Sequence, residues 1–243
     1  MSSYNIFANG IATRPSVLAE LGYFGNDSAW LTDNDTFAWD LTGSSHALAS
    51  LNNIGGRPCI SLTSDGNATT DYGQFQSTVA GILLGTSTQT YRQKGSFRMA
   101  SVATQELSFG LSTVNTSLFA NVGSLTDYLM IKKLTGATSF NLVYRKASGT
   151  AQASGTFGPT LAADTWYDYE LVFTKANSTV GSGRVTIYMG TDLAAGGTLS
   201  QVFDQVIATE FPDTVKMASF GAWRAGTAAA VASYMNYFGV RMV

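Results

Sequence analysis

Alternation of apolar and polar residues with a period of two is the feature that most constrains the fold of this chain. Residues 166–175 show it most clearly, because aromatic and aliphatic side chains occupy every second position from Tyr167 to Phe173. Successive side chains of a β-strand point to opposite faces, so this segment has one core face and one mixed face. Similar segments recur from about residue 58 onward, separated by Gly, Asn, Asp and Ser clusters. The pattern predicts an all-β protein built as an antiparallel β-sandwich.

The predicted strands are placed by this alternation and by the turn residues between them. A turn at residues 135–138 joins two of them into a hairpin. Residues 147–160 are rich in Ser, Gly, Ala and Thr and are interpreted as a long loop or an edge hairpin rather than a domain boundary. The expected strands cover residues 59–63, 73–77, 95–102, 106–114, 128–134, 139–145, 166–175, 184–189, 219–223 and 233–242.

The domain organisation follows from the absence of any helical layer between these strands. We expect a single sandwich over residues 26–243, preceded by residues 1–25 as an N-terminal arm or as the first strand. Pro15 and Gly22 bracket residues 13–21 and predict one short peripheral helix there. Residues 1–25 are rich in apolar side chains that some surface must bury.

Composition excludes several functional classes. Charged residues make up 12% of the chain, where soluble proteins average roughly 25%. The net charge of −2 and the absence of a Lys/Arg stripe argue against a nucleic-acid partner. No apolar run approaches the roughly 20 residues that span a bilayer, and the N-terminus lacks the pattern of a secretory signal. We therefore expect a protein made in a cytosol, with no membrane partner and a surface of hydroxyls, amides and small residues.

The only histidine and the only cysteine limit the possible chemistry. A catalytic triad would need His46, which lies in a polar segment that we interpret as a loop, and no nucleophile elbow occurs. Cys59 is interpreted as a small buried side chain of a strand. A same-face carboxylate pair, Asp168 and Glu170, has a spacing that glycosidase chemistry permits, although a solvated or interface face is the preferred interpretation. We therefore expect no catalytic residues and no enzyme activity.

Oxygen-bearing side chains cluster in one loop at Asp65, Asn67 and Asp71. They resemble the first half of a calcium loop, but the glycine and the final glutamate of an EF-hand are missing. A second oxygen-rich group lies at residues 33–35. Turn formation explains both groups adequately, so we expect no metal and no cofactor, with these three residues as the first ligands to consider.

Several segments together resemble the concanavalin A-like lectin/glucanase jelly roll. They are residues 95–102, residues 106–111, the run Trp166-Tyr-Asp-Tyr-Glu-Leu-Val-Phe, the run Val185-Thr-Ile-Tyr, and the closing run from Tyr234 to Val243. The resemblance covers most of residues 58–243 and implies the fold more strongly than the function. The acidic triplet of the family's glucanases is absent, because Trp166 stands two positions before Asp168. The family's calcium and sugar residues cannot be matched to this sequence either.

A jelly roll with few charges and no signal peptide is similar to the decoration and minor structural proteins of tailed-bacteriophage virions. The resemblance implies a non-enzymatic virion protein, located in the virion, that binds a major capsid protein or another virion protein and forms homo-oligomers. The alternatives are a lectin-like module of a phage tail or receptor-recognition protein that binds a surface glycan, and, more distantly, a glycan hydrolase. The expected interface residues are the apolar side chains of the N-terminal segment, namely Tyr4, Ile6, Phe7, Leu21, Tyr23 and Phe24.

Overall fold

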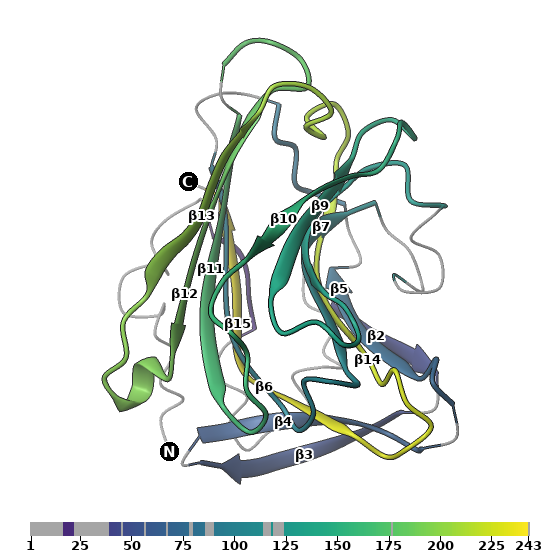
Figure 1. Ribbon diagram of the computed structural model, residues 1–243. Helices are drawn as coiled ribbons and strands as arrows, with labels where there is room; N and C mark the ends of the chain where they lie inside the picture. Colours follow the sequence, from purple (N-terminus) through teal and green to yellow (C-terminus); the bar gives the residue numbers. More distant parts are fainter. Residues whose placement is uncertain are drawn as a thin grey trace.

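The computed structural model is an all-β sandwich of two antiparallel sheets that face each other (Figure 1). It describes residues 17–21, 39–44, 46–55, 57–66, 68–77, 80–85, 90–113, 118, 124–175 and 177–242. One 3₁₀ turn, Leu193–Ala195, accompanies the strands in this part of the chain. No helix among these residues is long and apolar enough to cross a membrane. The predicted fold class is confirmed.

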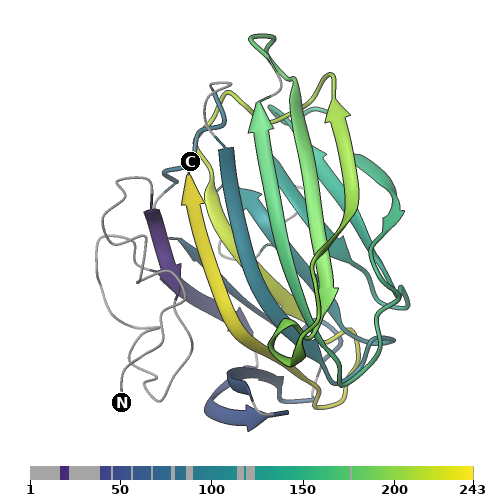
Figure 2. The same cartoon turned by 90° about the vertical axis from the view of Figure 1, so that its left-hand side faces the viewer.

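Sheet A contains both the N-terminal and the C-terminal strands described (Figure 2). Its order is β13 (Ser200–Ile207), β12 (Gly183–Thr191), β11 (Trp166–Lys175), β6 (Thr90–Met99), β15 (Ala232–Met242), β4 (Arg57–Ser64) and β3 (His46–Ile54), with β1 (Val17–Leu21) also paired to β15.

Sheet B packs against sheet A through its inner face. Its order is β10 (Gln152–Phe157), β9 (Phe140–Arg145), β8 (Tyr128–Lys133), β7 (Glu106–Ser112), β14 (Ala218–Arg224), β5 (Tyr72–Ser77) and β2 (Trp39–Ser44). We call the face of each sheet that is turned away from the other sheet its outer face.

The core lies between the sheets and is rich in aromatic rings. The inward face of β11 is buried as predicted, with Tyr169 at 1% exposure and Phe173 at 0%. Tyr169 stacks on Phe109 of sheet B with ring centroids 4.6 Å apart. Gly95 on β6 permits this packing, because a Cβ atom there would lie 2.6 Å from the Tyr169 ring. The alternating aromatics of β11 therefore join the two sheets.

Two local predictions were wrong, and three strands were not predicted. Val17–Leu21 forms strand β1 rather than part of a helix, because it pairs with the C-terminal strand β15. His46 begins strand β3 and is not in a loop, since its register partner is Ser64 on β4. For residues 147–160 the edge-hairpin alternative is confirmed, because β10 pairs with the preceding strand β9 at the edge of sheet B. No strand was predicted over β2, β3 or β13.

The predicted interface segment is described only in part. Tyr4, Ile6, Phe7, Tyr23 and Phe24 lie outside the described residues. Leu21 is the last residue of β1 and is the register partner of Phe238. Residues 17–21 are thus placed as a strand beside the C-terminal one, the arrangement expected if this part of the N-terminal segment belongs to the jelly roll.

Candidate functional site

Asp168 and Glu170 project from the outer face of β11, as their alternation with Tyr167 and Tyr169 predicts. Asp168 accepts hydrogen bonds from both terminal nitrogens of Arg57, at 3.2 and 3.3 Å. It also accepts the backbone N–H of Leu193 at 2.8 Å. Both carboxylate oxygens of Asp168 are therefore occupied by structural donors.

Arg57 holds the tip of the β3–β4 hairpin against sheet A. Its guanidinium is buried and bonds Asp168 and Asp192. It also lies 5.2 Å from the ring centroid of Trp166, whose Nε1 donates to the carbonyl of Ile54 at 3.0 Å. Burial lowers the pKa of Arg57, but the hydrogen bonds that it donates to the two aspartates outweigh burial and the pKa is raised. The cluster is a permanently charged anchor for the hairpin.

Glu170 is neutralised by two cations of the neighbouring strand β6. Arg92 donates to its Oε1 at 2.7 Å, and Lys94 lies 3.2 Å from its Oε2. The carboxylates of Asp168 and Glu170 are thus both held in ion pairs with strands β4 and β6.

Cys59 is fully buried, as predicted. Burial raises the pKa of its thiol, with smaller opposing effects from the Ile54 backbone and Arg98. A buried thiol with a raised pKa is a poor nucleophile. Cys59 therefore serves as a small core side chain.

The three loop residues considered as metal ligands are partly placed. Asp65 and Asp71 lie close enough for a hydrogen bond between their carboxyl groups. Asn67 and residues 33–35 lie outside the described residues. Across the described ranges, no group of three or more His, Cys, Asp or Glu side chains could hold a metal ion.

A polar group on the outer face of sheet B was missed by sequence reasoning. Glu106 accepts the hydroxyl of Thr135 at 3.0 Å and lies 3.8 Å from Arg224 of β14. Lys132 of β8 faces the same side, and burial, together with Arg224, lowers its pKa against the opposing effect of Glu106. Alternation within β7 and β8 was the available signal, but only the register of the three strands brings Glu106, Lys132 and Arg224 together.

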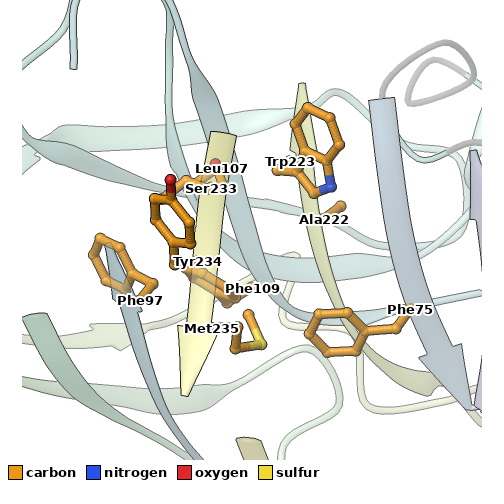
Figure 3. A pocket seen from close by; sticks show the side chains of 9 residues that line it. All are labelled: Phe75, Phe97, Leu107, Phe109, Ala222, Trp223, Ser233, Tyr234 and Met235. Atoms are coloured by element: carbon orange, nitrogen blue, oxygen red, sulfur yellow. The ribbon is translucent and has the colours of Figure 1, made fainter. Parts of the chain in front are cut away.

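A small cavity lies within the core between the sheets (Figure 3). Its volume is about 10 Å³, close to the smallest space that holds one water molecule. The atoms that line it are apolar, so it offers no hydrogen-bond partner to a water. The cavity is therefore a packing gap and is too small for a substrate. It is lined by Phe75, Phe97, Leu107, Phe109, Ala222, Trp223, Ser233, Tyr234 and Met235.

Comparisons with known proteins support the fold class but assign no function. No protein-family model matches the chain, and no curated protein matches it by sequence. Among solved structures, the PL-14 alginate lyase from the marine Aplysia kurodai is similar with a TM-score of 0.60 and 11% identity, over 94% of this chain and 99% of that one. A protein of unknown function from Shewanella oneidensis MR-1 has a TM-score of 0.59 and 16% identity, over 90% and 84%.

Plant lectins share the same architecture. Lectin II from Ulex europaeus has a TM-score of 0.54 and 11% identity, over 84% of this chain and 92% of that one. The chain therefore has the lectin-type jelly-roll fold that the sequence resemblance implies. Because lectins and a lyase both use this fold, the fold alone does not decide between binding and catalysis.

Proposed function

We propose that the chain is a non-enzymatic structural protein of a virion, a decoration or minor capsid protein that attaches to the particle surface. The observation that supports this most is the internal neutralisation of charge on and around the outer face of sheet A. Five cations there face five carboxylates: Arg57, Arg92, Lys94, Arg98 and Arg184 pair with Asp164, Asp168, Glu170, Asp192 and Asp204.

Neutralisation of this kind suits packing better than catalysis. A catalytic site keeps a titratable group poised for proton transfer, and an electrostatically steered ligand needs a net local charge. Among the described side chains of this face, the paired groups leave neither. A surface of hydroxyls and amides can instead lie against a neighbouring subunit if its polar groups are hydrogen-bonded across the contact, at a lower cost than burying unpaired charges.

Attachment would use the apolar N-terminal segment. In this proposal Tyr4, Ile6, Phe7, Leu21, Tyr23 and Phe24 pack against a major capsid protein or a sister subunit. Specific interfaces bury upwards of about 1,000 Å² in total, which a segment with these aromatics can largely supply.

The test changes this segment without removing β1. A variant with Tyr4→Ser, Ile6→Ser and Phe7→Ser is compared with Leu83→Ser, which alters an exposed apolar residue of the body. We expect the triple variant to keep the wild-type melting temperature but to stop binding particles in a sedimentation assay, while the control binds normally. Undiminished particle binding by the triple variant contradicts attachment through these residues.

Carbohydrate binding is the second candidate, favoured by the polar group on the outer face of sheet B. Glu106, Lys132 and Arg224 offer donors and acceptors of the kind that bind sugar hydroxyls, and Lys132 and Arg224 are only half-buried. A glycan array with wild-type protein and Lys132→Ala tests it. Binding lost in the variant supports a lectin role, and no binding by the wild type excludes it for the glycans tested.

A further inference from the structure

The loop between β4 and β5 holds a buried carboxyl group that has no cationic partner among the described side chains. Asp71 is only 2% exposed, and its Oδ2 has no hydrogen-bond partner among the described residues. The neighbouring carboxyl is Asp65, which is exposed and hydrogen-bonds to Asp71. A buried carboxylate is costly unless it is paired, so this arrangement needs a compensating charge.

The segment packed against this loop supplies no such charge. Residues 225–231 lie alongside it, since the N–H of Ser64 donates to the carbonyl of Val231 at 3.1 Å and the N–H of Ala225 donates to the backbone carbonyl of Asp71 at 2.8 Å. These seven residues are Ala, Gly, Thr and Val only. The loop is also fixed in shape, because Gly66 has φ +86° and a Cβ atom there would lie 2.9 Å from the Ala230 nitrogen.

The nearest cation in the adjoining strand β14 is committed elsewhere. Arg224 donates from Nε to the carbonyl of Thr69 at 3.2 Å, and its Nη1 lies 3.8 Å from Glu106. The guanidinium therefore contacts the loop through a backbone carbonyl rather than through the carboxyl pair. Arg224 and Glu106 are charged groups near this end of the loop. His46 begins β3 as the register partner of Ser64, the residue before Asp65, and is a further titratable residue at this end.

Two carboxyl groups that share a hydrogen bond must also share a proton. Burial, the Asp65 hydrogen bond and the Asp65 charge raise the pKa of Asp71, while the Ala68 backbone opposes them. When the shared proton leaves, two negative charges face each other across a short distance. A hard divalent cation relieves that repulsion and takes carboxylate oxygens as ligands.

We propose that Asp65 and Asp71 bind a divalent cation of the calcium type. The ion replaces the shared proton, with Asp71 as the buried ligand and Asp65 as the ligand on the solvent side. β4 and β15 belong to sheet A, whereas β5 and β14 belong to sheet B. Because residues 65–71 and 225–231 connect these strands, the ion stabilises these two crossings between the sheets.

The test measures thermal unfolding with and without calcium at neutral pH. Wild type is compared with Asp71→Asn, Asp65→Asn and the control Asp164→Asn, which alters an exposed carboxylate paired with Arg98. We expect calcium to raise the melting temperature of wild type and of the control by several degrees, because an ion that binds only the folded state stabilises it. Both loop variants should show no calcium response. Asp65→Asn changes an exposed side chain, so it keeps the test valid if Asp71→Asn folds poorly.

Direct binding provides the second measurement. Terbium, a calcium substitute, should show luminescence sensitised by the adjacent Tyr72, displaced by calcium and absent in Asp71→Asn. Two results overturn the proposal. One is a wild-type melting temperature that ignores calcium and rises only on acidification, which indicates a shared proton alone. The other is a calcium response that survives in both loop variants, which places the ion elsewhere.

Discussion

Two buried aspartates, Asp213 and Asp71, differ in the charge of the groups that lie beside their carboxyl groups. The carboxylate of Asp213 is fully buried and accepts hydrogen bonds from Lys146, Lys175 and the N–H of Gly181. Burial raises its pKa, but these three donors outweigh burial and hold the pKa below its usual value. Asp71 has a second carboxyl group as its neighbour, and its pKa is raised.

The difference shows what decides the role of a buried charge in this fold. The two aspartates are buried to a similar extent, so the identity of their partners determines which protonation state of each carboxyl group is preferred. Asp213 is a structural pin that connects the chain before β14 to the ends of β9 and β11. Asp71 has no cationic partner among the described side chains. For this reason the loop of Asp71, and not the Asp213 cluster, is the candidate ion site.

Removing the structural pin should give the largest effect. Asp213→Ala leaves Lys146 and Lys175 without their shared carboxylate, and breaking a buried pair in this way costs about 3–5 kcal/mol. We expect a loss of that size in the free energy of unfolding measured by urea titration. Asp164→Ala, at a side chain 63% exposed, is the matched control and should change little. Equal losses in the free energy of unfolding from the two variants would show that the buried ion pairs of Asp213 do not stabilise the fold.

The pH dependence of stability should separate the two aspartates next. The Asp213 contribution is present above the unfolded pKa of about 3.8 and is lost as the pH falls through its lower folded pKa. The Asp71 contribution is present below about 3.8 and is lost as the pH rises through its higher folded pKa. In metal-free buffer, the free energy of unfolding of wild type minus that of Asp71→Asn should therefore fall with rising pH. The corresponding difference for Asp213→Asn should rise with pH. Slopes of the same sign for the two differences would contradict the opposite pKa shifts.

Lys133 extends the comparison to a buried cation without a carboxylate contact. Its ammonium donates to the carbonyls of Val102 and Gln105, and burial lowers its pKa to about 8 against the weaker effect of Glu106. Between pH 8 and about 10 the unfolded chain holds a proton that the folded chain has lost, so stability should rise by at most about 1.4 kcal/mol per pH unit. Chemical denaturation across this range, with Lys133→Met as control, checks it. A flat difference between the two proteins would contradict the lowered pKa.

The smallest effect is expected at the exposed pair on the edge of sheet A. Arg184 bonds Asp204 at 2.7 Å, but both side chains are screened by water. Arg184→Ala should leave the melting temperature unchanged within the error of scanning calorimetry. A clear drop in the melting temperature would mean that exposed ion pairs on the outer face contribute to stability, against the expectation that only buried pairs do.

The sequence predicted the fold where alternation was strong and failed where pairing decided the outcome. β11 matches its predicted bounds because aromatic residues alternate along its whole length. β13 was not predicted, since the register shift in its pairing with β12 breaks its alternation. The sequence did not decide between a loop and the edge hairpin that β10 forms, because Ser, Gly and Ala carry no apolar signal. Edge strands in general bury less side-chain surface and so leave a weaker pattern.

The sites were predictable only in part, for a related reason. Asp168, Glu170, Asp65 and Asp71 could be identified because each pair is local in sequence. Their partners could not be found, since Arg57 lies 111 positions from Asp168 and no short-range pattern encodes that contact. Whether a carboxylate is neutralised or left without a cation depends on tertiary contacts alone.

We propose that this jelly roll is a structural component of a virion and not an enzyme. Quantitative mass spectrometry of virus particles, purified by density gradient from cells that produce the chain, tests this proposal most directly. We predict that its peptides are present at a fixed ratio to those of the major capsid protein and persist through high-salt washing. Peptides confined to the soluble lysate, with none in the purified particles, would contradict the claim.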